Sequence, residues 1–377
     1  MKIGICTIVD YSNYGNRLQN YALQEVLKKY GHEPQTIKNY YEKSVPKKSI
    51  ISKIITTPPQ KIVKKGLLKI NKREIENKKK LEKILLKRRS RFKQFTELYI
   101  KESINVIDNY TEDFSFEENL DCFIIGSDQV WNHNFPRFSA YDFVDYSKKP
   151  KIAYAASFGV NEIQDEYVAI YRRGLTDIDF LSVRENEGKE IISKLISKKA
   201  AVVLDPTLLL TLNEWEDLLV GLKKFKQKYI LVYLLDNPKK EWLSFINNYA
   251  QNNKLKIITL SESAESEYWE SGPLEFLNLI YQAESIFTDS FHGCVFSLIF
   301  EKEFTVFDRN TDIASMNSRL NTLLSDFSLI NRWFDGSNKE KINYLEIREK
   351  IDERRKDSLN YLFNSLTHIE EEIVKNE

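Results

Sequence analysis

The sequence predicts an α/β protein of two doubly wound domains that face each other across a cleft. Short apolar segments alternate with segments of helical period in both halves of the chain, which is the pattern of parallel sheets covered by helices. Several apolar segments end in polar turns, and open α/β sheets bind ligands at such turns. The length of 377 residues exceeds one ordinary hydrophobic core, so two domains are expected.

The first domain begins with a predicted strand–helix–strand unit. Residues 2–9 (KIGICTIV) form a short apolar run that predicts a buried parallel strand. A polar loop, residues 10–16, leads into a helix that ends at Gly31, and residues 33–37 form the next strand. Because the loop reaches the start of a helix, it is either an anion or sugar site or a plain polar connection. It lacks the glycine spacing of a dinucleotide-binding motif.

A strongly basic segment follows at residues 43–93. It holds 19 Lys or Arg and three Glu, whereas the whole chain has a net charge of +1, so the remainder is acidic. One helical face of this segment is apolar and carries Leu81, Ile84, Leu85, Phe92 and Phe95. Two interpretations stay open: a solvated helical insertion that docks on the first domain, or a peripheral contact with anionic lipid headgroups. Nucleic-acid binding is disfavoured, since aromatic side chains are few and no reader motif is present.

The next polar turn follows the buried strand at residues 122–125 and reads Gly-Ser-Asp-Gln-Val-Trp. Ser127, Asp128 and Gln129 would lie at the carboxyl edge of a parallel sheet. Asp128 and Gln129 could hold sugar hydroxyls, and Trp131 could stack on a sugar face. The alternative is a capped strand-to-helix turn with a core tryptophan.

Three further strand-like runs complete the first domain, at residues 151–158, 180–185 and 201–206. Arg184 stands at the end of the second run, where it either binds an anion or pairs with a neighbouring carboxylate. A helix from Thr211 and a lysine-rich connector to Lys228 then mark the hinge between the domains.

The second domain repeats the alternation of strands and helices. Its strands are predicted at residues 229–235, 256–260, 286–288 and 304–307, and its helices at residues 239–252, 273–281 and 294–300. A loop containing Ser315 to Arg319, a leucine-rich helix and a charged helix at residues 340–375 follow.

The turn that carries His292 is the strongest candidate for chemistry in this domain. The segment TDSFHG, residues 288–293, lies between a strand and the start of a helix, where unpaired N–H groups attract anions. An imidazole at this position can donate a proton and contact a phosphate or carboxylate. A buried histidine bonded to backbone is the alternative interpretation.

Cysteine and histidine usage excludes several classes of site. The three cysteines and four histidines are scattered along the chain, which predicts neither a disulfide framework nor a zinc site. The N-terminus lacks the length of a signal peptide, and no uncharged stretch is long enough to span a bilayer. We expect a cytoplasmic protein, with the inner face of the membrane as a possible peripheral location, and no metal.

Taken together, these motifs resemble the polysaccharide pyruvyl transferase family. The resemblance is carried by SNYGNRLQNYALQEVLKKYGHE, FIIGSDQVWN, AYAASFG, SVRENEG, VVLDPTLLL, PLEFLNLIYQAESIFTDSFHGCVFSLIFEKEF and NSRLNTLL, in family order from residue 1 to about 330. It implies a GT-B-like architecture of two Rossmann-like domains. Residues 1–212, with the helical insertion 43–93, would form the acceptor side; residues 226–340 would form the phosphoenolpyruvate (PEP) side, and residues 341–377 a charged helix.

The resemblance also implies a reaction: transfer of the pyruvyl group of PEP to two hydroxyls of a sugar, which gives a cyclic ketal. The acceptor would belong to a cell-surface polysaccharide, such as a capsule, or to its lipid-linked precursor, and no cofactor would be required. His292 matches the histidine of the family motif and would be the acid. Some members carry Arg-Leu-His where this chain has Ser290-Phe291-His292, so the arginines that hold PEP must come from elsewhere.

The remaining candidate residues follow from the charges of PEP and the hydroxyls of a sugar. A carboxylate and a phosphate call for bidentate arginines, and we expect Arg184, Arg309 and Arg319 to bind them, with Arg319 assisted by Asn317. Asp128 would be the base or hydroxyl holder. Ser290, Tyr14, Asn16, Ser127, Gln129 and Trp131 complete the predicted substrate-binding set.

Two competing functions share the predicted fold, because a fold does not fix a function. One is a GT-B glycosyltransferase that uses a nucleotide sugar and releases a nucleotide. The other is a catalytically silent scaffold of a polysaccharide assembly complex, attached through residues 43–93.

Overall fold

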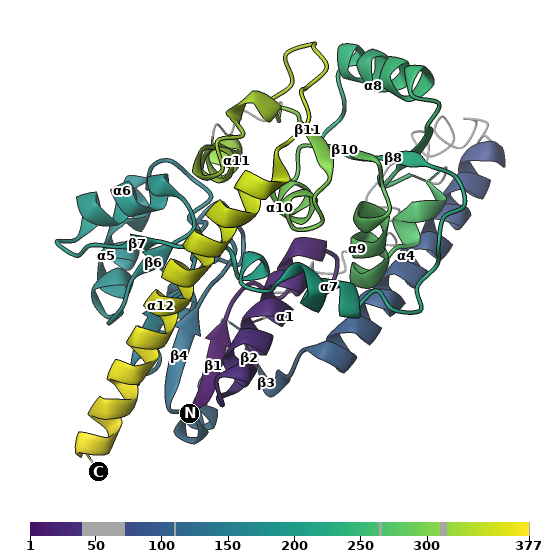
Figure 1. The fold of residues 1–377 in the computed structure, drawn as a ribbon. Coiled ribbons are helices and arrows are strands. Elements are labelled where there is room, and N and C mark those ends of the chain that lie inside the picture. Colours follow the sequence, from purple (N-terminus) through teal and green to yellow (C-terminus); the bar gives the residue numbers. More distant parts are fainter. Residues whose placement is uncertain (40–71, 109–110, 264–265, 310–314, 377) are drawn as a thin grey trace.

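The computed structural model describes residues 1–39, 72–108, 111–263, 266–309 and 315–376. It consists of two parallel sheets, each covered by helices, and a long C-terminal helix that runs along both (Figure 1). We call the part that holds the first sheet the N-terminal half and the part that holds the second sheet the C-terminal half. The α/β fold predicted from the alternating pattern is confirmed.

The N-terminal half is built on a five-stranded parallel sheet of order β3-β2-β1-β4-β5. Its strands are β1 (Lys2–Cys6), β2 (Glu33–Asn39), β3 (Glu102–Ile107), β4 (Cys122–Ile125) and β5 (Lys151–Ala153). Single bridges from Ile152 to Phe180 and from Ala156 to Val183 continue it to the pair β6 (Ser182–Val183) and β7 (Ala201–Val202). β4 is buried on both faces, which explains its uninterrupted apolar sequence.

Helix α1 (Tyr14–Lys29) connects β1 to β2, and its first turn faces the C-terminal half. The Asn13 side chain accepts a hydrogen bond from the Asn16 N–H and so caps the helix. Gly31 follows with a φ of +82°, a conformation that suits glycine after a helix end. The other helices of this half are α5 (Val168–Thr176), α6 (Asn186–Leu195) and α7 (Leu212–Asp217).

The C-terminal half contains a four-stranded parallel sheet of order β11-β10-β8-β9. The strands are β8 (Tyr229–Tyr233), β9 (Lys256–Thr259), β10 (Ser285–Thr288) and β11 (Glu303–Val306). The chain goes from β8 outward to β9 and then returns to the other side of β8, so β8 and β10 flank a topological switch point. Ligands of open α/β sheets bind at such a point.

The helices of this half are α8 (Lys240–Asn252), α9 (Pro273–Tyr281), α10 (Phe291–Ile299) and α11 (Ser315–Asp326). The expected loop from Ser315 to Arg319 is therefore wrong, since α11 begins at Ser315. The helix forms because apolar residues recur at helical spacing: Leu320, Leu323 and Leu324 are all buried.

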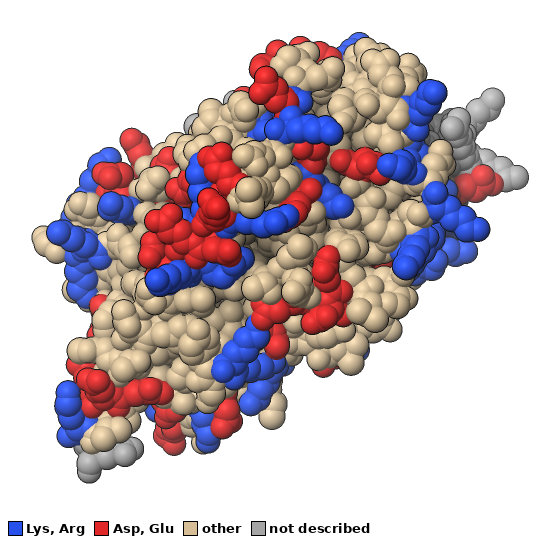
Figure 2. Space-filling view, in the orientation of Figure 1, with Lys and Arg blue, Asp and Glu red and all other residues tan. Residues whose placement is uncertain are grey.

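Helix α4 (Lys72–Tyr99) carries the described part of the basic segment, while residues 43–71 lie outside the described residues. Ile84, Phe92 and Phe95 are buried, as the predicted apolar face requires. The helix does not dock on the N-terminal half alone, because Arg91 forms an ion pair with Glu270 of the C-terminal half at 3.1 Å. Lys and Arg gather over the edge where α4 lies (Figure 2).

Helix α12 (Tyr344–Asn376) also contacts both halves. The Tyr344 hydroxyl donates to the Lys302 carbonyl in the C-terminal half. Further along, the Ser358 hydroxyl accepts from the Leu204 N–H at 3.0 Å, and the Tyr361 hydroxyl donates to the Ala153 carbonyl at 3.1 Å. None of the described helices is both long enough and apolar enough to cross a bilayer.

Candidate active site in the cleft between the halves

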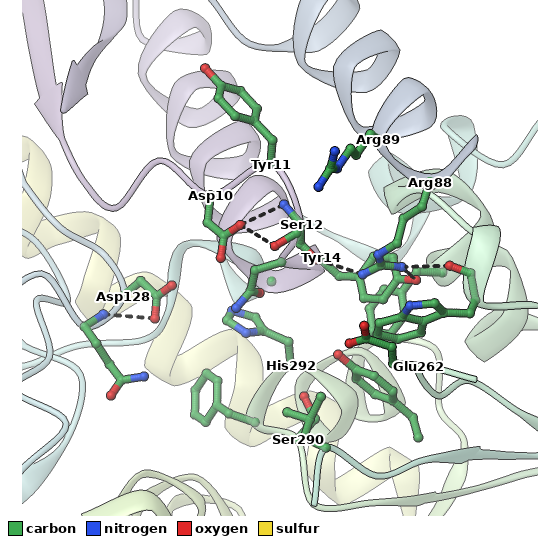
Figure 3. A pocket seen from close by; sticks show the side chains of 18 of the residues that line it. Asp10, Tyr11, Ser12, Tyr14, Arg88, Arg89, Asp128, Glu262, Ser290 and His292 are labelled. Carbon is green, nitrogen blue, oxygen red and sulfur yellow. Dashed lines mark hydrogen bonds between the residues drawn. The ribbon is translucent and has the colours of Figure 1, made fainter. Parts of the chain in front are cut away.

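A cavity of about 570 Å³ lies between the two halves. Its walls come from the loop before α1, the turn after β4, the turn between β10 and α10, and helix α4 (Figure 3). The side chains that carry its chemistry are Asp10, Ser12, Tyr14, Arg88, Arg89, Asp128, Gln129, Tyr233, Glu262, Ser290, His292, Arg309 and Arg319.

The turn between β10 and α10 is fixed by its own side chains. The Thr288 hydroxyl donates to the Tyr233 carbonyl at 2.7 Å, and the Ser290 N–H donates to that hydroxyl at 3.0 Å. Ser290 caps α10 by accepting from the Gly293 N–H at 3.3 Å. A Cβ at Gly293 would lie 2.5 Å from the Thr288 hydroxyl, so only glycine lets the helix approach the strand this closely. The TDSFHG segment therefore aims the start of α10 into the cavity.

His292 lies on the cavity wall between the two halves. A Cβ at Gly15 of α1 would fall 1.9 Å from the imidazole Nδ1, so the ring packs directly against the first turn of α1. Its Nε2 lies 3.7 Å from Asp205 Oδ2, an ion-pair separation that is longer than an ordinary hydrogen bond. The side chain is 11% exposed. His292 is thus partly buried, faces the cavity and has a carboxylate within reach.

Three buried carboxylates surround the guanidinium of Arg184 behind the cavity wall. Arg184 lies 2.7 Å from Asp205, 3.5 Å from Asp128 and 3.9 Å from Glu185. Burial lowers the pKa of Arg184, but the first two carboxylates more than offset this and raise it. Of the two interpretations of Arg184, pairing with neighbouring carboxylates is confirmed, and the predicted contact with a substrate anion is wrong. The residue instead holds Asp128 and Asp205 in place.

Asp205 and Asp128 are both ionised by this network. Burial would raise the pKa of Asp205, but His292, Arg184 and Thr207 hold it well below its ordinary value. Burial likewise opposes ionisation of Asp128, and Arg184, followed by His292, lowers its pKa. Both carboxylates are therefore hydrogen-bond acceptors at neutral pH, and that of Asp128 lines the cavity.

Arg309 and Arg319 form the cationic wall on the side of the C-terminal half. The Arg309 Nε donates to the Asp289 carbonyl at 3.1 Å and lies 3.7 Å from the Asp289 carboxylate, and the residue lines the cavity. Burial, and then the charge of Arg184, lowers the pKa of Arg319 to about 10. Arg319 remains charged at neutral pH, so two guanidinium groups flank the start of α10. This is a suitable environment for an anion.

Seven of the predicted site residues line the cavity: His292, Asp128, Arg309, Arg319, Ser290, Tyr14 and Gln129. Two more support it from behind. Asn16 donates to the Ile8 carbonyl at 2.7 Å and to Asp128 at 3.3 Å, and Ser127 donates to the Ala155 carbonyl at 3.0 Å. Their side chains hold the loops rather than a ligand.

We expected Trp131 to stack on a sugar face and Asn317 to assist Arg319, and both predictions are wrong. Trp131 is completely buried, stacks on Phe143 with ring centroids 5.6 Å apart, and donates its indole N–H to the Asp142 carbonyl at 3.2 Å. It presents no face to a sugar. Asn317 donates to Asp308 and lines a different, smaller pocket, so it does not assist Arg319.

Sequence reasoning missed the contribution of α4 and of Asp205. Arg88 is 4% exposed and lies over the rings of Tyr14 and Trp269, at 4.2 and 4.0 Å from the centroids. The sequence does not distinguish Arg88 from the many solvated Lys and Arg side chains of the basic segment. Asp205 stands at the end of a strand-like run, as Asp128 stands after one. The pattern that identified Asp128 could therefore have identified Asp205.

Comparison with solved structures establishes the architecture. The UDP-GlcNAc 2-epimerase of Neisseria meningitidis, bound to UDP-GlcNAc, matches with a TM-score of 0.52 and 12% identity over 100% of both chains. The UDP-GlcNAc 2-epimerase of Methanocaldococcus jannaschii matches with a TM-score of 0.50 and 11% identity, over 93% of this chain and 92% of that one. These likenesses concern the fold, which is GT-B-like, with two Rossmann-like halves.

Comparison of the sequence identifies the family. No curated protein matches the chain. The pattern of the polysaccharide pyruvyl transferase family matches residues 13–311. This span contains the start of α1, helix α4, the Asp128 turn and the His292 turn, all of which contribute residues to the cavity. The chain therefore belongs to the polysaccharide pyruvyl transferase family.

Proposed function

We propose that this protein transfers the pyruvyl group of PEP to two hydroxyls of a sugar of a cell-surface polysaccharide or its precursor, forming a cyclic ketal. The observation that carries the proposal is the placement of His292 at the start of α10, inside a cavity that also holds Arg309 and Arg319. A proton donor and two guanidinium groups suit a donor with one carboxylate and one phosphate.

PEP would bind on the side of the C-terminal half. Arg309 and Arg319 would form ion pairs with its two anionic groups, and the N–H groups at the start of α10 would add donors for the phosphate. Ser290 caps this helix by accepting from the Gly293 N–H, so the donors left for the phosphate would be the N–H groups of Phe291 and His292. The sugar would lie towards the N-terminal half, where Asp128 and Gln129 offer acceptors and donors for hydroxyls.

The reaction forms two C–O bonds and one C–H bond at the expense of the PEP double bond and one C–O bond. His292 gives a proton to the methylene carbon, which becomes a methyl group and leaves C2 electron-poor. A first hydroxyl oxygen bonds to C2, phosphate departs with the electron pair of its C–O bond, and a second hydroxyl oxygen closes the ring. One of the two hydroxyl protons regenerates the acid, and the other leaves with phosphate or solvent.

Asp128 and Asp205 would play different parts in this reaction. Asp128 orients the attacking hydroxyl, because its lowered pKa keeps it an acceptor. Asp205 lies 3.7 Å from the His292 Nε2 and would stabilise the imidazolium form of the ring before proton transfer. The base for the second hydroxyl would be the neutral imidazole that remains after the first step.

The test is to incubate the protein with PEP and a panel of sugar acceptors and to look for a pyruvate ketal by mass spectrometry, together with phosphate release. Nucleotide release from a nucleotide sugar, with no reaction of PEP, would favour the glycosyltransferase alternative and refute the proposal. His292→Ala should sharply lower kcat for ketal formation while PEP still binds by calorimetry. Full activity of that variant would remove His292 from the mechanism.

A further inference from the structure

Phe291, the first residue of α10, contacts the other half of the molecule at the cavity. Its side chain lines the cavity, and the residue is 7% exposed. The Cζ of Arg184, which belongs to the N-terminal half, lies 4.4 Å from the centroid of the Phe291 ring. This distance is within the range of a cation–π contact. The start of α10 therefore packs on a cation of the opposite half.

Arg184 can hold this ring and its carboxylate partners at the same time. The N–H groups of a guanidinium lie in its plane, so its edge forms ion pairs while its faces stay available for an aromatic ring. The edge of Arg184 is used by Asp205 at 2.7 Å and by Asp128 at 3.5 Å. Arg184 is 5% exposed, and a cation–π contact that is shielded from water is stronger than one on the surface.

The ring of Phe291 is coupled to that of His292. The two ring centroids are 5.2 Å apart and the ring planes meet at 88°, an edge-to-face arrangement that is favourable for aromatic rings. The His292 Nε2 lies 3.7 Å from Asp205 Oδ2, the same oxygen that accepts from Arg184. Because the two residues are consecutive in the first turn of α10, a shift of Phe291 away from Arg184 would carry His292 away from Asp205.

We propose that Phe291 is a positioning residue: its ring packs over the Arg184 guanidinium, holds the start of α10 against the N-terminal half and so fixes His292 for proton transfer. The role in proton transfer rests on the proposed function, whereas the contact between the halves does not. The Cζ of Arg319 lies 6.0 Å from the same ring, at the outer limit of a cation–π contact. Phe291 should therefore act on kcat and leave the affinity for PEP unchanged.

A phenylalanine at this position could also act by filling space alone, and fluorination separates the two roles. Fluorine changes the shape of the ring little but withdraws electrons from its faces, which weakens the attraction of a cation. Mono-, di- and trifluorinated phenylalanine are introduced in place of Phe291 in the full chain. The matched control is the same series in place of Phe300, which directly follows α10, is buried and packs on the rings of Phe296 and Tyr281.

Two measurements are made on each protein. One is kcat for phosphate release from PEP with a saturating acceptor, and the other is hydrogen exchange of the amides in the first turn of α10 without substrate. We expect kcat to fall stepwise with the number of fluorine atoms at Phe291, by up to about 30-fold, which corresponds to the ~2 kcal/mol of a desolvated cation–π contact. The amides should exchange faster in the same order. Phe291→Leu should resemble the trifluorinated ring, and Phe291→Tyr should retain most of kcat, because it keeps the aromatic face.

The series at Phe300 should leave kcat and the exchange unchanged, and the Kd of PEP, measured by calorimetry, should not change in any variant. Equal responses at Phe291 and Phe300, a kcat that does not depend on the number of fluorine atoms at Phe291, or a parallel loss of PEP affinity would overturn the inference. Exchange needs no turnover. If exchange follows fluorination but no ketal forms, the proposed function is refuted and the contact between Phe291 and Arg184 stands. If a ketal forms at a rate indifferent to fluorination, only the role of Phe291 is refuted.

Discussion

Substitution of Gly15 by alanine is the sharpest test of how His292 is positioned. The new Cβ would lie 1.9 Å from the imidazole Nδ1, whereas ordinary contact begins at 3.4 Å, so the ring must retreat by about 1.5 Å. Alanine is favoured over glycine in a helix by about 1 kcal/mol, so α1 itself should not suffer. A reacting group displaced by about 1 Å typically costs about 100-fold in rate. We therefore expect Gly15→Ala to lower kcat for ketal formation about 100-fold.

The assay is steady-state phosphate release from PEP with a saturating acceptor, alongside calorimetric binding of PEP. PEP affinity should change little, because the proposed PEP contacts are Arg309 and Arg319, whereas the atoms nearest to a Cβ at Gly15 all belong to His292. The control is the double variant Gly15→Ala/His292→Ala, which should be no slower than His292→Ala alone, since both changes act through one side chain. Normal kcat in Gly15→Ala, or additive losses in the double variant, would refute the reasoning.

Three further predictions concern stability. Arg88→Met should lower the free energy of unfolding by about 3 kcal/mol, since several buried carbonyls lose a charged donor; urea denaturation with Lys83→Met as the control checks this. The folded-state pKa of Asp205 lies below its unfolded value, so its stabilisation is present above about pH 4 and fades as the pH falls further. Asp205→Asn should therefore flatten the loss of stability in acid, and an unchanged acid slope would contradict this. Trp131→Phe should cost about 1–2 kcal/mol through the lost indole hydrogen bond and partial cavity, without changing the KM of the sugar. If Trp131→Phe instead raised the KM of the sugar at unchanged stability, the predicted stacking of Trp131 on the sugar would be supported.

Residues that follow strands could be located from the sequence. Strand β4 was predicted with its observed ends because a segment buried on both faces must be apolar throughout. Asp128 and His292 come directly after such segments, and parallel strands deliver their carboxyl ends to one edge of the sheet. The same reasoning failed for Trp131, because sequence position does not tell which side of a turn a large ring faces. Only the packing of Phe143 on that ring settles it.

Residues on helices were harder to assign, since a helical surface offers several faces and the neighbours are distant in sequence. Arg184 was correctly placed at a strand end, but its partner Asp205 could not be identified without the fold. Asn317 was assigned to a loop, and its location in α11 turns its side chain towards Asp308. Arg88 is the clearest case, because its charge resembles that of its solvated neighbours and only its aromatic surroundings distinguish it.

The position of α4 has a consequence for how the cavity is built. The loop before α1, the Asp128 turn and the His292 turn all follow carboxyl ends of strands, and these form the walls that any GT-B-like pair of sheets would bring together. Arg88 and Arg89 follow no strand, and they close a side of the cavity that the sheets leave open. Arg91 continues this contact through Glu270, and a Cβ at Gly272 would lie 2.6 Å from the Arg91 side chain. Helix α4 is thus packed as closely as a core element, and the basic segment from residue 72 onward is a wall of the site rather than an appendage to it.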